Sequence, residues 1–146
     1  MKISIPTDND GYVLLQCERC GEYFKLIPSD IEDDNNLWIY CPMCGMTSNS
    51  YWTEDVIELA LKMATNYAID CIYEAVKPLE KNNKKSPIKI KVGKKPKKEY
   101  ESPLSAGIDS LEIKKYRCCT KTAKIHPLLK ISDSYCPFCG VNDYGD

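Results

Sequence analysis

At residues 17–21 the chain reads Cys17-Glu-Arg-Cys20-Gly21, and at residues 41–45 it reads Cys41-Pro-Met-Cys44-Gly45. Two Cys-x-x-Cys pairs about twenty residues apart supply the four thiolates that a tetrahedral Zn²⁺ ion needs. Glycine follows each pair, where a positive φ lets backbone N–H groups turn toward the sulfur atoms. The pattern predicts a closed structural zinc site in which the protein fills all four positions, so we expect no catalysis at this metal.

The residues around these pairs predict a small antiparallel sheet. Apolar and aromatic runs at 12–15, 23–27 and 37–40 are typical of strands, and the acidic stretch 28–36 is typical of a hairpin tip. Over about residues 12–46 the arrangement resembles the zinc ribbon family, of the kind found in transcription factor IIB. The resemblance implies two zinc knuckles on a three-stranded sheet, and partners that are DNA, RNA or protein.

A second, altered copy of this pattern lies near the C-terminus and ends in Cys136-Pro-Phe-Cys139-Gly140. Residues 20–28 align with residues 119–127, because each stretch runs from a cysteine through a strand with lysine at the same place to a proline. In this register Tyr116 stands where Cys17 stood, and Thr120 stands where Gly21 stood. The second copy therefore lacks one ligand and one glycine of the first.

The second copy still predicts a zinc site, with Cys119, Cys136 and Cys139 as three of its ligands. The fourth ligand is Cys118 or His126, unless the site is incomplete. His126 is the only histidine, but it lies seven residues beyond Cys119, which at about 3.3 Å per strand residue is some 20 Å from the metal. Cys118 needs only a local distortion, so we favour Cys118 and expect two Zn²⁺ ions per chain.

From Thr53 to residue 77 the apolar period changes to that of a long amphipathic helix, which we expect Pro78 to end. We expect either that both ribbons and a strand at 88–92 pack on this helix, or that it forms a homodimer seam. Cys71 lies on the apolar face and is interpreted as a core cysteine. The predicted face consists of Val56, Ala60, Met63, Ala64, Tyr67, Cys71 and Ala75, widened by Ile57, Leu61, Ala68, Ile72 and Val76.

Charge is unevenly distributed along the chain, whose formal net charge is only -1. Residues 1–76 are strongly acidic, whereas residues 77–98 contain ten lysines against one glutamate. Lysine is a point charge suited to phosphate, so we expect this segment to bind nucleic acid with little sequence preference. The expected contacts are Lys84, Lys85, Lys89, Lys91, Lys94, Lys95, Lys97 and Lys98.

The sequence thus predicts an α+β protein with four parts: an N-terminal zinc ribbon (1–52), a long helix (53–77), a lysine-rich linker with a short strand (78–110) and a degenerate C-terminal zinc ribbon (111–146). The signatures of zinc deaminases, metalloproteases and nucleotide-binding loops are missing, so we expect no enzyme and no small-molecule substrate. Neither a signal peptide nor a membrane span is recognisable, which favours a reduced, cytoplasmic protein. We expect an adaptor that binds nucleic acid in transcription or nucleic-acid processing, or alternatively a protein–protein interaction module, homodimeric through the helix.

Overall fold

The computed structural model describes residues 2–82 and 87–145. The chain is a mixed α and β protein that divides into two compact units. The helical unit comprises Met1–Ser4 and Asp55–Pro103, and the sheet unit comprises Ile5–Glu54 and Leu104–Asp146. Both copies of the cysteine pattern therefore lie in the sheet unit. Among the described residues, none of the helices is long and apolar enough to cross a membrane.

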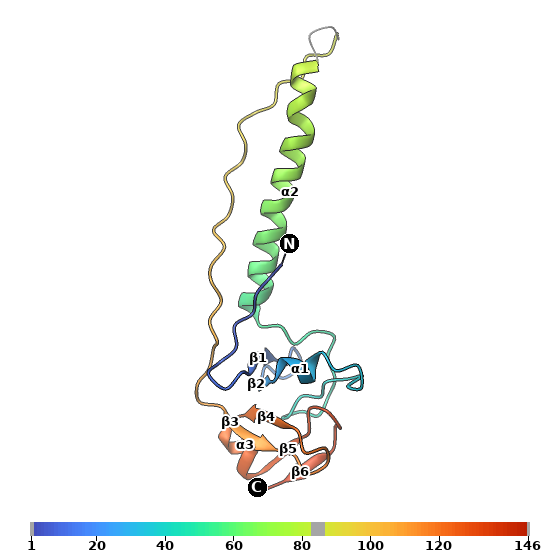
Figure 1. Ribbon diagram of the computed structural model, residues 1–146, viewed down its shortest axis with the longest axis vertical. Coiled ribbons are helices and arrows are strands. Elements are labelled where there is room, and N and C mark those ends of the chain that lie inside the picture. Colours follow the sequence, from blue (N-terminus) through green and yellow to red (C-terminus); the bar gives the residue numbers. More distant parts are fainter. Residues whose placement is uncertain (1, 83–86, 146) are drawn as a thin grey trace. The chain divides into compact units, whose positions relative to one another are not determined.

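The centre of the sheet unit is one antiparallel sheet of four strands in the order β1-β2-β4-β3 (Figure 1). Strands β1 (Val13–Gln16) and β2 (Tyr23–Leu26) form the hairpin of the first copy, and β3 (Glu112–Lys115) and β4 (Thr122–Ile125) form that of the second. The strands predicted at 12–15 and 23–27 are confirmed to within a residue or two. The hairpins join where Lys25 pairs with Lys124, so the two copies complete each other's sheet.

Short elements follow each hairpin in the same order. The one-turn helices α1 (Pro28–Ile31) and α3 (Pro127–Ile131) both begin at proline, whose fixed φ suits the first helical position. In the second copy, β5 (Asp133–Tyr135) and β6 (Asn142–Tyr144) then form a two-stranded ladder.

The strand predicted at 37–40 is wrong, because the first copy forms only a single bridge between Tyr40 and Thr47. After Thr47 the chain leaves this position and runs to Tyr51, whose carbonyl accepts the Gln16 N–H at 2.8 Å. The backbone that would continue a ladder beyond the Tyr40–Thr47 bridge therefore forms its hydrogen bond with the edge of β1 instead.

One hydrophobic core serves both copies. Phe24 and Leu26 of the first copy and Tyr116 and Ile125 of the second belong to the same buried cluster. Tyr51 closes the cluster with an edge-on contact to Phe24, with ring centroids 5.7 Å apart. Because neither hairpin alone covers these side chains, each copy depends on the other for its core.

Helix α2 (Glu54–Asn82) dominates the helical unit and is 29 residues long. The prediction that Pro78 ends it is wrong, because Pro78 lies inside the helix. Proline removes one backbone donor but its φ is helical, and Pro78 is exposed, so water can satisfy the carbonyl that loses its partner.

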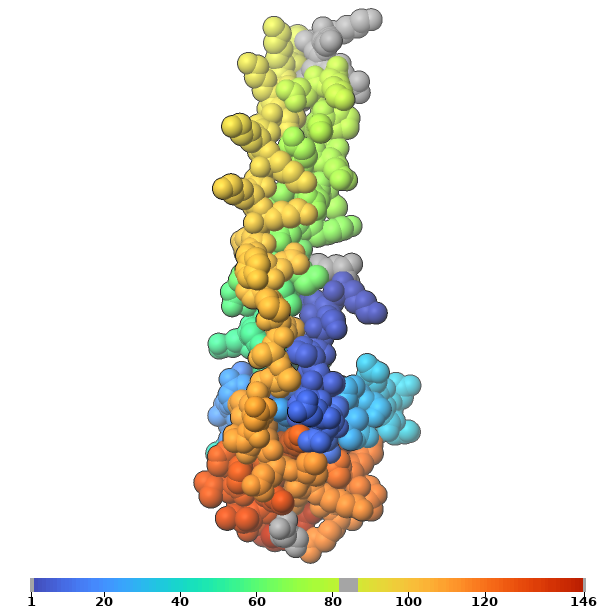
Figure 2. All heavy atoms as spheres, turned by 60° about the vertical axis from the view of Figure 1, so that its left-hand side comes forward, coloured from blue at the N-terminus to red at the C-terminus, as the bar shows by residue number. Residues whose placement is uncertain are grey.

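Residues 87–103 run as an extended segment beside α2, as Figures 1 and 2 both show. Asn66, only 4% exposed, anchors this segment: its side-chain oxygen accepts the Glu99 N–H at 2.8 Å and its side-chain nitrogen donates to the Glu99 carbonyl at 2.9 Å. The strand predicted at 88–92 is wrong, because the neighbour of these residues is a helix, which offers no free backbone groups for a ladder.

The extended segment also decides which face of α2 is covered. The covered face is centred on Asn66, Asp70 and Tyr73, while Ala64, Tyr67, Cys71 and Ala75 of the predicted face are exposed. The interpretation of Cys71 as a core cysteine is therefore wrong. Val56, Ala60 and Met63 of the predicted face are at least partly buried. The covered face thus combines apolar side chains with the polar anchors Asn66 and Asp70.

Candidate metal centres

The first cysteine group has the geometry of a metal site. The sulfur atoms of Cys17, Cys20, Cys41 and Cys44 all lie within 4.8 Å of one another. The Cys17–Cys44 and Cys20–Cys41 sulfur distances are 3.9 and 3.5 Å, close to the separation of about 3.8 Å that follows from a Zn–S bond of about 2.3 Å in a tetrahedron. The four residues could hold one metal ion.

Tight backbone turns hold the first group together. The Gly21 N–H donates to the Cys17 carbonyl at 2.8 Å, and the Gly45 N–H donates to the Cys41 carbonyl at 2.9 Å. Both glycines have positive φ, 76° and 67°. The two knuckles thus have the same backbone form, with their sulfur atoms directed to one point.

The second group consists of four cysteines from the C-terminal copy, and it too could hold a metal ion. Its sulfur atoms lie within 4.8 Å of one another, and those of Cys119 and Cys136 are 3.5 Å apart. The structure brings Cys118 into this group and leaves His126 outside it. The Nδ1 atom of His126 instead accepts the Leu128 N–H at 3.2 Å and caps α3. The group is formed by Cys118, Cys119, Cys136 and Cys139.

The altered knuckle keeps the backbone of the first copy although its ligand has moved. The Thr120 N–H donates to the Tyr116 carbonyl at 2.9 Å, as Gly21 does to Cys17, and Thr120 takes a φ of 61°. Tyr116 is fully buried in the place of Cys17, and its hydroxyl lies 3.2 Å from the Ser134 hydroxyl. The missing thiolate is supplied by Cys118, two positions further along the same turn.

Each group contains thiols that are poor acids when no cation is near. Burial raises the pKa of Cys41 and Cys136, and burial together with the neighbouring thiols of Cys118 and Cys119 raises the pKa of Cys139 to about 11. A divalent ion reverses this preference, because its charge favours the thiolate form of each ligand. Metal binding by these groups therefore releases protons and contributes directly to folding.

The two candidate centres are joined by reciprocal contacts between their Cys-Pro-x-Cys knuckles. The Tyr40 N–H donates to the Pro137 carbonyl and the Tyr135 N–H donates to the Pro42 carbonyl, both at 2.8 Å. Sequence reasoning did not foresee this exchange. The available signal was a tyrosine directly before each knuckle, which occurs in both copies.

The tyrosine rings explain why glycine closes both knuckles. A Cβ added at Gly45 would lie 2.8 Å from the Tyr135 ring, and one at Gly140 would lie 2.9 Å from the Tyr40 ring. Each ring therefore packs directly on the glycine of the opposite knuckle. The two candidate centres are thus in direct contact through their knuckles.

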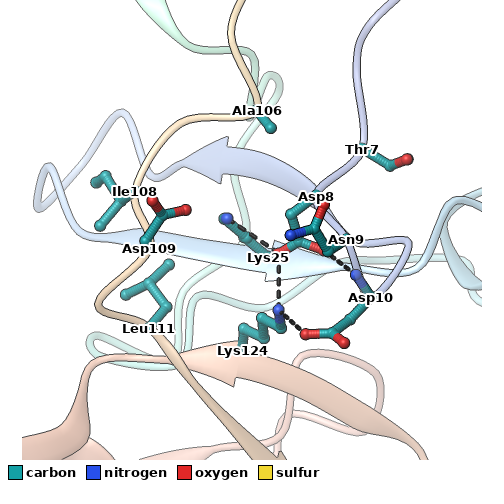
Figure 3. Close-up of a pocket in the computed structure, with 10 residues that line it drawn as sticks. All are labelled: Thr7, Asp8, Asn9, Asp10, Lys25, Ala106, Ile108, Asp109, Leu111 and Lys124. Carbon is teal, nitrogen blue, oxygen red and sulfur yellow. Dashed lines mark hydrogen bonds and ion pairs between the residues drawn. The ribbon is translucent and has the colours of Figure 1, made fainter.

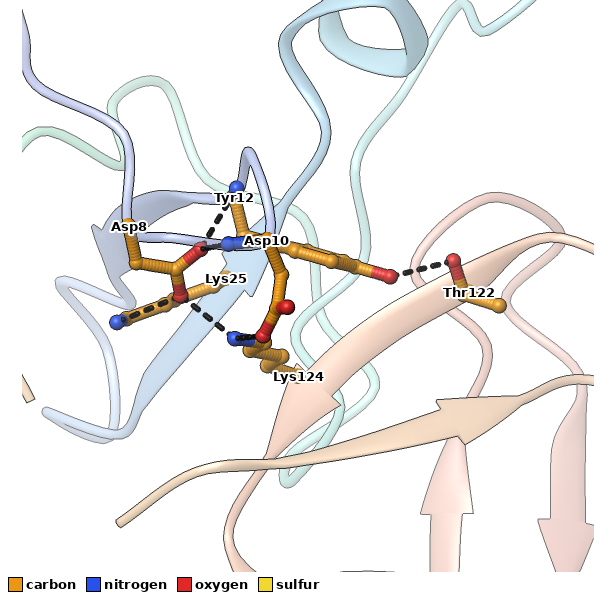
Figure 4. Close-up of polar contacts among 6 residues, drawn as sticks. All are labelled: Asp8, Asp10, Tyr12, Lys25, Thr122 and Lys124. Atoms are coloured by element: carbon orange, nitrogen blue, oxygen red, sulfur yellow. Dashed lines mark hydrogen bonds and ion pairs between the residues drawn. The ribbon is translucent and has the colours of Figure 1, made fainter. Parts of the chain in front are cut away.

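Where the two hairpins meet, two lysines share a carboxylate (Figure 4). The Asp8 carboxylate accepts from the Lys25 ammonium at 3.0 Å and from the Lys124 ammonium at 2.8 Å, and Asp10 accepts from Lys124 at 2.6 Å. Lys25 is only 1% exposed. Tyr12 adds a contact between the copies, because its hydroxyl lies 2.8 Å from that of Thr122.

A cavity of about 320 Å³ opens beside these lysines (Figure 3). The ammonium of Lys25 and the carboxylate of Asp109 point toward the hollow, and Ala106, Ile108 and Leu111 form its apolar side. Asp8 and Asp10 already balance the two lysines, so the added carboxylate of Asp109 makes the walls acidic overall. This charge balance disfavours the binding of an anion in the cavity. The two lysines instead help to join the two copies through Asp8.

The expected nucleic-acid contacts differ in their surroundings. Lys84 and Lys85 lie outside the described residues. The ammonium groups of Lys95 and Lys98 both pair with the Asp70 carboxylate at 2.6 Å. The others are exposed and make no ion pair with any residue that the structure describes; they are Lys89, Lys91, Lys94 and Lys97.

Comparison with known proteins finds no family model, curated protein or solved structure that matches this chain. The likeness between the two halves of the sheet unit is internal: hairpin, proline-led helical turn and cysteine knuckle recur in the same order. The chain thus contains two ribbon-like copies with a candidate metal centre in each.

Proposed function

We propose that this protein is a zinc-binding, non-enzymatic adaptor that binds nucleic acid through the exposed lysines of residues 87–98. Two Zn²⁺ ions, one in each cysteine group, stabilise the sheet unit. The helical unit presents the cationic segment. Binding is to phosphate groups and has little preference for base sequence.

The choice of zinc rests on the ligand set. Four thiolates at tetrahedral spacing suit Zn²⁺, and a site with four protein ligands leaves no position for a water or substrate. The ions are therefore structural. No step of a reaction is assigned to them, in keeping with a non-enzymatic role.

The observation that carries the proposal is a contrast between lysines. In the sheet unit, Lys25, Lys121, Lys124 and Lys130 are each held by a carboxylate within 3.4 Å. In the helical unit, the four lysines at 89, 91, 94 and 97 are exposed and have no acidic partner among the described residues. A run of unneutralised ammonium groups on one segment attracts a polyanion.

The acidic side chains of the N-terminal copy compete less for these lysines than their number indicates. Asp30 and Asp33 each lie 3.3 Å from the Lys121 ammonium, and Asp8 and Asp10 are used by the buried lysines. Four of the carboxylates in this part of the chain are therefore engaged within the sheet unit. The lysine segment is left available to an external partner.

The test measures binding of labelled duplex DNA and single-stranded RNA by fluorescence anisotropy over a range of salt concentrations. Four engaged lysines predict that log K falls against log salt with a slope of about -3.6 on duplex DNA, from about -0.9 per phosphate. Replacing Lys89 and Lys94 with glutamine should make the slope about 1.8 less steep.

The matched control replaces Lys62 and Lys130 with glutamine. It removes the same charge, but these lysines are paired with Glu58 and Glu112. The control should leave the salt slope unchanged. Failure of the wild-type protein to bind either nucleic acid at low salt refutes the proposal, and so does an equal loss in both double variants, because net charge alone would then account for binding.

A further inference from the structure

The face of α2 opposite the extended segment is a continuous uncharged stripe. At 100° per residue its members lie on the side of the helix away from Asn66 and Tyr73, which the segment covers. All of them are exposed, and none is charged. The stripe consists of Ile57, Leu61, Ala64, Ala68, Cys71, Ile72, Ala75 and Leu79.

The spacing of the stripe is that of a coiled-coil seam. Residues 57, 61, 64, 68, 71 and 75 follow one another at alternating intervals of four and three, the a and d positions of a heptad repeat. Such a repeat keeps the same line of a helix against a partner helix over its whole length. Leu61 is 64% exposed at the second of these positions, so the seam is uncovered in the single chain.

We propose that a second copy of this chain covers the stripe, with the two α2 helices antiparallel. In antiparallel coiled coils an a position faces a d position of the partner. Here that register places Ile57 opposite Ala75 of the second copy, Leu61 opposite Cys71, and Ala64 opposite Ala68. Ile57 and Leu61 each meet a small side chain, and the Ala64–Ala68 layers lie at the centre, so the two ends of the seam are filled equally.

A parallel pair would fill the seam unevenly. Ile57 and Leu61 would each meet their own copy at one end, and the alanines at 68 and 75 would meet at the other. The helices would then be forced apart at one end and leave a gap at the other, which costs packing contacts. The sizes of the side chains thus select the antiparallel arrangement.

The distribution of charge selects the same arrangement. The first half of α2 and its neighbours on the extended segment are predominantly acidic, with Asp55, Glu58, Glu99 and Glu101, whereas residues 77–98 hold most of the lysines of the unit. A parallel pair would bring the two lysine segments together. An antiparallel pair places the cationic end of each copy beside the acidic end of the other, which lowers the repulsion.

This inference does not depend on the proposed nucleic-acid binding, and its test uses no nucleic acid. Light scattering after size exclusion should give twice the mass of the single chain for the wild type. Leu61→Glu should give the mass of one chain with unchanged circular dichroism, because Leu61 is exposed and its change disturbs no internal packing. The matched control is Leu128→Glu in α3, also 64% exposed, which should remain dimeric.

A disulfide reports the orientation. In Leu61→Cys, mild oxidation of the metal-loaded protein should link residue 61 of one copy to Cys71 of the other, found by peptide mass mapping. Ten helical residues separate these positions by about 15 Å within one chain, too far for an intrachain bond. The expected pattern is a 61–71 link in the variant and no Cys71–Cys71 link in the wild type.

Three results would overturn the inference. A wild-type mass of one chain at the highest attainable concentration removes the dimer. A Leu61→Glu variant that stays dimeric shows that the α2 stripe is not the interface. A Cys71–Cys71 link in the oxidised wild type shows that the helices run parallel and refutes the proposed orientation.

Discussion

Replacing Asp8 with asparagine should destabilise the sheet unit far more than replacing Lys25 with methionine. Asp8 is the only carboxylate within bonding distance of the Lys25 ammonium among the described residues, and it also holds Lys124. Asp8 accepts hydrogen bonds from the N–H groups of Asp10 and Tyr12 at 3.1 and 3.0 Å. Asparagine has the same size and keeps an oxygen that can accept both bonds. The substitution therefore removes mainly the charge.

The magnitude follows from burial. Side-chain exposure is 1% for Lys25 and 9% for Asp8, so the variant leaves an ammonium buried without a counter-charge. Removing one partner of a buried ion pair costs about 3–5 kcal/mol. Lys25→Met removes the buried cation instead, and Asp8 keeps Lys124 at 2.8 Å; we expect a cost of about 1 kcal/mol or less.

The effect of Asp8 should also depend on pH in a defined direction. Burial raises the pKa of Asp8, but hydrogen bonds from Lys124, the Tyr12 amide and Lys25 outweigh it and hold the pKa well below its ordinary value. A carboxyl whose pKa is lowered by folding stabilises the protein above its unfolded pKa, about 3.9, and loses this contribution as the pH falls through the folded value. The difference between wild type and Asp8→Asn should therefore shrink below about pH 4.

Urea denaturation at pH 7 and at a fixed metal concentration measures the free energy of unfolding of both variants. The reasoning is refuted if Asp8→Asn lies within about 1 kcal/mol of the wild type, or if Lys25→Met costs more than Asp8→Asn. Either result would mean that the lysine pair does not depend on Asp8 for its charge balance.

Three further predictions concern the knuckles. Gly140→Ala should cost more unfolding free energy than Gly21→Ala in urea denaturation, because both have positive φ but only Gly140 lies against the Tyr40 ring. Thr120→Gly should stabilise the protein by about 1 kcal/mol in the same assay, since it relieves a β-branched residue at a φ of 61°. Cys136→Ser should lower zinc content from two ions per chain to one by elemental analysis, and amide exchange in β1 and β2 should rise because the copies share a sheet.

Equal costs at the two glycines would count against the ring contact. A loss of stability in Thr120→Gly would show that its side-chain hydrogen bond to the Cys119 carbonyl, 2.7 Å long, outweighs the backbone strain. Unchanged exchange in β1 and β2 after Cys136→Ser would show that the two copies fold independently.

Features that depend on near neighbours in the chain could be predicted from the sequence. The Cys-x-x-Cys-Gly pairs, the first two strands and the long helix are all set by residues within one turn or one hairpin of each other. The alignment in which Tyr116 takes the position of Cys17 could also be predicted from the sequence, because the altered knuckle repeats the local backbone pattern of the first copy. The C-terminal end of α2 could not be predicted, because proline permits a helical φ and the exposed position of Pro78 tolerates the lost backbone donor.

Contacts between distant segments were decided only by the tertiary structure. The backbone pairing of β2 with β4, at Lys25 and Lys124, joins the two copies. No periodicity in either copy specifies that these two strands are the ones that meet. The face of α2 that is covered depends on where Asn66 and Asp70 find partners some thirty residues later. Sequence patterns determine what each segment can bury, whereas the choice among buried faces is made by the complementarity of whole surfaces and by the polar groups that must be paired between them.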